Sequence, residues 1–135
     1  ISSEVTPLPS EGVIVKRDAS CFTAPELAAT LRHLGTEWLI VMGCWSEACV
    51  VATVKDAVDR GVRVLLVKDA CGSGSRAMHE TAVLNMANRL YGGAVADTDR
   101  TLALIDGGQA TVWRTDLPVP IKFTYESAAA DYASL

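Results

Sequence analysis

The sequence predicts an α/β fold built around a mostly parallel sheet. Short, continuous apolar runs alternate along the chain with stretches in which apolar residues recur at helical spacing. Half of the residues are hydrophobic but only 6% are aromatic, and this aliphatic bias suits strands that are buried on both faces. The connections are brief, so right-handed crossovers should join successive strands. With 135 residues, the chain fits a single domain over 1–135.

Local signals define the elements in the first third of the chain. Pro25 favours the first turn of a helix, Thr23 is expected to cap that helix, and Gly35 ends it. Between these signals the apolar residues fall on one helical face. The expected elements are, in order, a loop over 1–11, a short strand over 13–15, the helix from 25 to about 34, and a strand over 38–42.

The middle of the chain continues the alternation of strands and helices. Apolar positions keep helical spacing from Val50 to Arg60, and Gly61 terminates that helix. A strand over 62–67, a loop over 69–75 and a helix from about 76 to 90 are expected to follow. The last helix should turn these residues inward: Met78, Ala82, Val83, Met86 and Leu90.

Turn-forming residues divide the last third of the chain. Asp106-Gly107-Gly108 separates two apolar runs, which is a hairpin signal. Further on, Pro118 and Pro120 precede an Ala-rich end. The expected elements are a short edge strand at Val95, two hairpin strands over 101–105 and 110–114, and a tail over 115–135 that ends in a short helix or an arm.

The composition argues against several classes of function. The formal net charge is −4 and the basic residues are scattered, so we expect no binding to nucleic acid or to anionic membranes. No apolar run approaches the roughly 18 residues that a membrane span needs. The spacing of the four cysteines does not resemble a zinc ribbon, and we expect no metal site. Reduced thiols and a cytoplasmic location are expected instead.

The stretch richest in chemistry is Gly43-Cys44-Trp45-Ser46-Glu47-Ala48-Cys49-Val50. An apolar run leads into it and a helical pattern leaves it, which predicts a strand-to-helix elbow. Cys49 would lie in the first helical turn, where unpaired N–H groups and the helix dipole favour a nucleophilic thiolate. Ser46 is a candidate cap for that helix. The alternative is that Cys49 is a small buried hydrophobe, as free cysteine often is.

This stretch resembles the nucleophile segment of the isochorismatase-like cysteine hydrolases. The resemblance runs from about residue 5 to 97, and it implies a three-layer, Rossmann-like α/β/α sandwich around a mostly parallel sheet. It rests on these further residues: Val13-Ile14-Val15-Lys16 and Ser20-Cys21-Phe22 upstream, then Thr53, Asp56-Ala57 and Gly61, and Val67-Lys68-Asp69-Ala70-Cys71, His79 and Tyr91-Gly92-Gly93 downstream.

The resemblance implies an Asp–Lys–Cys triad. Cys49 matches the nucleophile and Lys16 the lysine, whose positive charge would favour the thiolate. The family's aspartate lies on a strand before the matched region, and neither Asp18 nor Asp69 corresponds to it. We therefore expect the carboxy-terminal part of a longer polypeptide, or a chain that a second chain completes. The third alternative is a family member without its base, acting as a binding or scaffold module.

The resemblance also places a cis peptide bond at Cys44–Trp45. An oxyanion hole would consist of the backbone N–H groups of Trp45 and Cys49. Phe22, Trp45 and Ser46 are expected to line a compact, partly apolar pocket for a planar small molecule. For both aromatic residues, packing in the core is the alternative.

The presence of a cysteine favours the amidase branch of the family, because isochorismate vinyl-ether cleavage needs no nucleophile. The resemblance implies a nicotinamidase, N-carbamoyl-amine or ureido type of substrate, and a thioester on Cys49. We expect a small-molecule amide partner and no cofactor in this region. Nicotinamidases hold a metal through residues before the matched region, so a metal there stays open. The proline-bearing tail suggests contact with a neighbouring subunit and a homo-oligomer.

Other features have simpler interpretations. Cys21 is expected either to fill space in the core or to be a second pocket thiol. His33 is expected to be solvated, and His79 is expected to pack or lie at the surface. A phosphate cradle at Gly72-Ser73-Gly74-Ser75 is disfavoured, because Ala77 stands where the dinucleotide fingerprint needs its third glycine. Thiol redox chemistry lacks a Cys-x-x-Cys pair.

Overall fold

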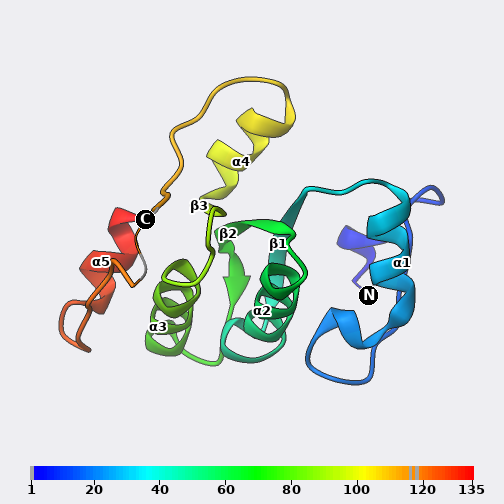
Figure 1. The fold of residues 1–135 in the computed structure, drawn as a ribbon. Helices are drawn as coiled ribbons and strands as arrows, with labels where there is room; N and C mark the ends of the chain where they lie inside the picture. The colour runs from blue at the N-terminus through cyan, green and yellow to red at the C-terminus, as the bar shows by residue number, and fades with distance from the viewer. Residues whose placement is uncertain (1, 116, 118) are drawn as a thin grey trace.

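A computed structural model describes residues 2–135 except Asp116 and Pro118, so Pro118 of the expected tail lies outside the described residues. The described residues form a three-stranded parallel sheet in the order β1-β2-β3 with helices around it (Figure 1), which confirms the α/β fold. The strands are β1 (Trp38–Cys44), β2 (Arg63–Gly72) and β3 (Ala94–Ala96), and the α-helices are α1 (Pro25–His33), α2 (Val51–Asp59), α3 (Arg76–Ala87), α4 (Thr98–Ile105) and α5 (Ala128–Ser134). Three short turns of other helix types are η1 (Ser3–Val5), η2 (Cys21–Thr23) and η3 (Ser46–Val50).

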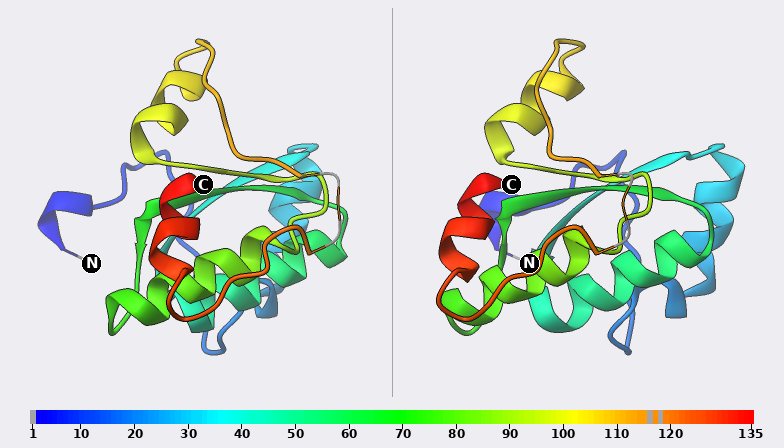
Figure 2. Two further views of the ribbon diagram at one scale, coloured as in Figure 1. Left: turned by 90° about the vertical axis from the view of Figure 1, so that its left-hand side faces the viewer. Right: turned by 60° about the vertical axis from the view of Figure 1, so that its left-hand side comes forward.

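One face of the sheet carries the main core. Helices α2 and α3 lie side by side over this face (Figure 2), as expected for parallel strands joined by helical crossovers. The partly buried face of α1 packs against the same core through Leu27, Ala28 and Leu31. The largest side chains that are fully buried in this core are Val54, Val64, Leu66, Val83, Leu84, Met86 and Val95.

The opposite face of the sheet is only partly covered within the described residues. Helix α4 lies on this side (Figure 2), and Val112 packs against Leu65 there. On β1, the alternate residues Trp38, Ile40 and Met42 keep their side chains exposed. The described residues thus place α2 and α3 on one face of the sheet and α4 on the other.

The expected strand over 13–15 is wrong. Residues 13–15 have no regular secondary structure, and the side chains of Val13 and Val15 are exposed. A strand requires a backbone partner, and none of the described residues pairs with this segment. An apolar run alone does not supply that partner.

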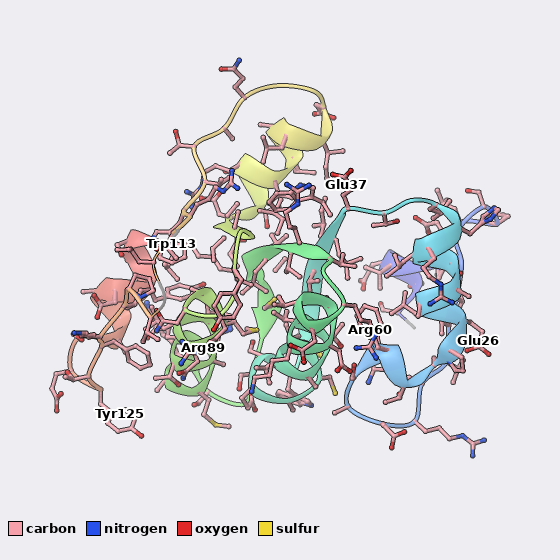
Figure 3. All side chains as sticks on the ribbon, viewed as in Figure 1. Glu26, Glu37, Arg60, Arg89, Trp113 and Tyr125 are labelled. Atoms are coloured by element: carbon pink, nitrogen blue, oxygen red, sulfur yellow. The ribbon has the colours of Figure 1, made fainter. Side chains whose placement is uncertain are left out.

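The expected hairpin over 101–114 is also wrong, because its first arm is helical. The side chain of Asp97 accepts a hydrogen bond from the backbone N–H of Arg100 at 2.9 Å and so caps α4. In the second arm, Trp113, which is labelled in Figure 3, forms an isolated antiparallel bridge with Val95. The cap at Asp97 starts a helix before the Gly-Gly turn signal is reached.

Smaller corrections concern the ends of elements. Helix α3 ends at Ala87 rather than near Leu90, and β2 extends to Gly72 into the expected loop. Helix α1 has Ala24 at its N-cap position with no side-chain hydrogen bond, so the cap expected from Thr23 is wrong.

The end of the tail is a short helix that packs on the same chain. Asn88 at the end of α3 exchanges two hydrogen bonds of 2.9 Å with the backbone of Ile121. Helix α5 then packs against α3, and Leu135 is buried. Figure 1 shows α5 beside α3. No helix among the described residues is long and apolar enough to cross a membrane.

Candidate functional site

The carboxyl end of β1 turns into a helix at Trp45. The turn η3 over Ser46–Val50 has π-helical character and continues directly into α2. The carbonyl oxygen of Trp45 accepts hydrogen bonds from the N–H groups of Ala48 and Val50, both at 3.1 Å. Cys49 therefore lies in the first turn of a continuous helical segment, which confirms the elbow. π-Helical turns are frequent at functional sites.

The backbone before the elbow is unusual. The peptide bond between Cys44 and Trp45 is cis, at the position that the family resemblance indicates. Gly43 has a φ of +123°, a conformation that residues with a side chain rarely adopt. The β1–β2 register shifts at the same point, since Val41 lies opposite Leu66 but Gly43 lies opposite Cys71.

Cys49 is partly exposed, and hydrogen bonds through Thr53 connect its backbone to Cys21. The buried hydroxyl of Thr53 donates to the carbonyl oxygen of Cys49 at 2.8 Å. The same hydroxyl oxygen accepts a hydrogen bond from the backbone N–H of Cys21 at 3.0 Å. The segment that carries Cys21 is therefore attached to the helix of the elbow.

A hollow of about 280 Å³ lies between residues 14–16 and β1. Lys16 lines this hollow together with Cys21, Met42 and Thr53. The Nζ atom of Lys16 donates to the backbone carbonyl of Asp18 at 2.9 Å. The structure thus brings Lys16 and Cys21 to a hollow that borders Thr53, the residue whose hydroxyl binds the carbonyl of Cys49.

The structure gives the three residues expected to line a substrate pocket different surroundings. Trp45 is 51% exposed, so its ring is free to face a substrate. The side chain of Ser46 does not cap the helix, so the expected cap is wrong. Ser46 is 0% exposed, and this burial does not support direct contact of its side chain with substrate. Phe22 is a core residue under the guanidinium of Arg60, which follows the end of α2, whereas Cys49 precedes the start of α2. This placement does not support Phe22 as a pocket residue.

The buried Ser46 belongs to a row of hydrogen bonds. Its hydroxyl donates to the carbonyl of Gly72 at 2.9 Å and lies 2.8 Å from Nδ1 of His79. On the other side of the ring, Nε2 of His79 lies 3.1 Å from the hydroxyl of Tyr132. The Tyr132 hydroxyl is also 3.3 Å from the carbonyl of Lys68. His79 is thus half-buried and has polar partners on both sides of its ring.

Two buried groups near the site have shifted pKa values. Burial raises the pKa of the Cys71 thiol to about 11, and the nearby Asp69 adds to this shift. Burial lowers the pKa of Lys68, and the positive charge of Arg100 lowers it further. The ammonium of Lys68 donates to the carbonyl of Tyr132 at 3.0 Å. Cys71 thus remains a neutral thiol at physiological pH.

The described residues contain no group of three His, Cys, Asp or Glu side chains that could hold a metal.

No local sequence pattern indicates the contacts that Thr53 and Tyr132 make. One signal for His79 was present: it is spaced by three and four residues from Ala82 and Val83, which are buried. Met78 was expected on that inward face, but it is 46% exposed.

Residues 1–100 match the isochorismatase domain family, so the chain belongs to that family. Maleamate amidohydrolase from Pseudomonas putida is 30% identical over 95 residues, which cover 70% of this chain and 44% of that protein. N-carbamoylsarcosine amidase from Arthrobacter is 28% identical over 106 residues, covering 78% of this chain and 39% of that protein. The crystal structure of an isochorismatase-like hydrolase from Alkaliphilus metalliredigens superposes with a TM-score of 0.71 at 25% identity, over 77% of this chain and 56% of that one. The chain spans less than half of the length of these two curated relatives.

Proposed function

We propose that this chain carries the nucleophile of a cysteine-dependent amidohydrolase. The enzyme would cleave a C–N bond of a small amide, carbamoyl or ureido compound. The observation that carries the proposal is the placement of Cys49, partly exposed in the first helical turn after β1 and joined through Thr53 to the hollow that Lys16 lines. The names of two relatives, maleamate amidohydrolase and N-carbamoylsarcosine amidase, support a C–N bond as the target.

The proposed reaction has two steps. The thiolate of Cys49 attacks the carbonyl carbon and forms a C–S bond, and the backbone N–H groups of Trp45 and Cys49 hold the oxyanion. The C–N bond then breaks, and the amine or ammonia leaves with the proton that a carboxylate took from the thiol. Water hydrolyses the thioester, which releases the carboxylic or carbamic acid and restores the thiol. Lys16 supplies positive charge that favours the thiolate.

The carboxylate would come from outside these 135 residues. Among the described residues, β1 pairs only with β2, so the backbone groups of its other edge lack a strand partner. The hollow lined by Ile14 and Lys16 runs beside Ile40 and Met42 of β1. We propose that an extended segment carrying the aspartate occupies this position, supplied by a longer polypeptide or by a second chain. The intact mass of the native polypeptide, with a search for a second chain in the same preparation, distinguishes these sources.

A binding or scaffold module is the second candidate function. It is favoured by the amine of Lys16, which donates to the backbone carbonyl of Asp18. In that case the intact protein would bind a small amide without hydrolysing it.

The test compares the intact protein with Cys49→Ala and with the control variant Cys71→Ala, which removes a partly buried thiol on β2. Maleamate, nicotinamide and N-carbamoylsarcosine serve as probes, and the release of ammonia is measured. We expect Cys49→Ala to abolish turnover at an unchanged unfolding midpoint, and Cys71→Ala to keep activity within a few-fold.

Alkylation of the wild-type protein provides a second measurement. Iodoacetamide should label Cys49 first among the four cysteines, and the loss of activity should follow that labelling. Turnover at the wild-type rate in Cys49→Ala would contradict the nucleophile assignment. Binding without turnover in every form of the intact protein would favour the scaffold alternative.

A further inference from the structure

The row Ser46–His79–Tyr132 connects the elbow to two other parts of the fold. Ser46 directly follows Trp45 and lies three positions before Cys49, so its position helps to define the first turn of the elbow. His79 comes from α3 and Tyr132 from α5, and the two rings meet edge to face with their centroids 5.3 Å apart. Both hydroxyls also reach carbonyl groups of β2.

The number of protons in this row determines how it is arranged. Four contacts join the two hydroxyls, the imidazole and the carbonyls of Gly72 and Lys68, but a neutral imidazole and two hydroxyls supply only three protons. We assign the missing proton to the longest contact, 3.3 Å from the Tyr132 hydroxyl to the carbonyl of Lys68. Ser46 then donates to Gly72, Nδ1 of His79 donates to Ser46, and Tyr132 donates to Nε2.

Charged groups around His79 act in opposite directions. Burial lowers the pKa of His79, while the carboxylates of Glu47 on η3 and Glu80 on α3 raise it. Glu80 is buried and is paired with Arg76 at 2.7 Å. On the β2 side, the ammonium of Lys68 stacks on the ring of Tyr132, 4.9 Å from its centroid. Burial is the largest of these effects, so the pKa of His79 is lowered overall and the neutral imidazole is favoured.

We infer that His79 is a positioning residue of the elbow: as a neutral imidazole protonated on Nδ1, it holds the hydroxyl of Ser46 against the carbonyl of Gly72. This contact fixes the turn that presents Cys49, and Tyr132 of α5 supports the imidazole from its other side. The inference rests on the proposed function of Cys49. It assigns no contact between His79 and the substrate.

Two substitutions at His79 test the hydrogen bonds of its two ring nitrogens separately. In His79→Asn, the side-chain amide lies near the position of Nδ1 and can still donate to Ser46. In His79→Gln, the amide lies nearer to the position of Nε2 and reaches Tyr132 instead. We expect His79→Asn to keep kcat within about 3-fold, and His79→Gln to lower kcat by about 10- to 100-fold with little change in KM, because a small misplacement of a nucleophile is costly. Equal losses in both variants, or wild-type kcat in both, would overturn the inference.

The tautomer of His79 provides a second readout, because a residue that only packed against its neighbours would not require a proton on Nδ1. The sequence contains two histidines, His33 and His79, so His33→Gln assigns the imidazole ¹⁵N signals in the folded protein. We expect the signals of a neutral imidazole protonated on Nδ1 at pH 7, and in Tyr132→Phe we expect the loss of the hydrogen bond to Nε2. A ring protonated on Nε2 alone, or a fully protonated ring at pH 7, would contradict the arrangement.

The rate at which iodoacetamide labels Cys49 tests the positioning independently of turnover. We expect this rate to change at least about 5-fold in His79→Gln and to stay near the wild-type value in His79→Asn. Equal turnover in wild type and Cys49→Ala would overturn the proposed function alone. Wild-type labelling rates in both His79 variants, together with an inactive Cys49→Ala, would overturn the inference alone.

Discussion

The hydroxyl of Thr53 donates to the carbonyl of Cys49 across one turn of helix, at 2.8 Å. Many threonines in helices bond back to the preceding turn in this way, but Thr53 also accepts the backbone N–H of Cys21. Residues 20–22 are thereby attached beside the elbow, and Lys16 lies only a few residues before them. One buried hydroxyl joins the two segments that the proposed reaction needs.

Replacing Thr53 with valine should destabilise the protein. The change keeps the shape of the side chain but leaves the backbone N–H of Cys21 without its partner, a loss of about 1–3 kcal/mol. Thr81→Val is the matched control, because the hydroxyl of Thr81 bonds back to Ala77 on α3 without accepting from another segment. Urea unfolding should show the loss for Thr53→Val and a change within about 0.5 kcal/mol for Thr81→Val. Equal midpoints for the two variants would show that the Cys21 contact contributes nothing.

Removing the amine of Lys16 should lower the proposed turnover by a large factor. Lys16 lines the hollow that borders Thr53, and without its positive charge Cys49 should be alkylated more slowly at pH 7 in Lys16→Ala. Arg17→Ala is the control, because Arg17 is exposed next to Lys16 but is not among the residues that line the hollow. Wild-type turnover and a wild-type alkylation rate in Lys16→Ala would argue against the role given to this lysine.

The stability of the protein should fall in alkaline solution because of Cys71. Its pKa is raised to about 11 from an ordinary value of 9.0, so the unfolded chain loses this proton at lower pH than the folded chain does. The stabilising contribution is fully present below pH 9 and is lost as the pH rises toward 11. Urea midpoints from pH 8 to 10.5 should fall more steeply for wild type than for Cys71→Ala. Parallel curves would contradict this assignment.

Gly93 should not tolerate a side chain. A Cβ atom at this position would lie 2.5 Å from the backbone carbonyl oxygen of Val64, which cannot move without disturbing β2. We expect Gly93→Ala to lose about 1–3 kcal/mol of unfolding free energy, as overpacked cores do. Gly74→Ala is the control, because nothing lies within 4 Å of its Cβ position. A thermal midpoint for Gly93→Ala equal to that of the control would contradict the close approach.

Local sequence signals predicted the parts of the fold that local contacts determine. Helices α1, α2 and α3, strands β1 and β2, and the elbow between β1 and α2 follow from apolar spacing, Pro25, Gly35 and Gly61. The Gly-Gly turn signal predicts a strand over 101–105, but the side chain of Asp97 caps α4 and makes this segment helical. Asp97 is itself a local sequence signal for the start of a helix.

Other features depend on contacts between distant residues. Residues 13–15 have the composition of a strand, but only a neighbouring strand could make them one. The row through Ser46 joins Ser46 to His79, 33 positions apart, and His79 to Tyr132, 53 positions apart. No local sequence pattern indicates that these residues interact. The family resemblance located Cys49 and Lys16, but it did not indicate that Thr53 connects their surroundings.

The most direct test of the account is to trap the covalent intermediate. The intact protein is mixed with maleamate, nicotinamide or N-carbamoylsarcosine and quenched with acid within the first turnover. It is then digested with trypsin together with a protease that cleaves after glutamate, so that cuts at Glu47 and Lys55 separate Cys49 from Cys44 and Cys71. We expect an acyl mass increment on the peptide that carries Cys49, absent from the Cys44 and Cys71 peptides and removed by hydroxylamine, which cleaves thioesters. Steady turnover of the same substrate with no increment on Cys49, and no loss of turnover in Cys49→Ala, would contradict it.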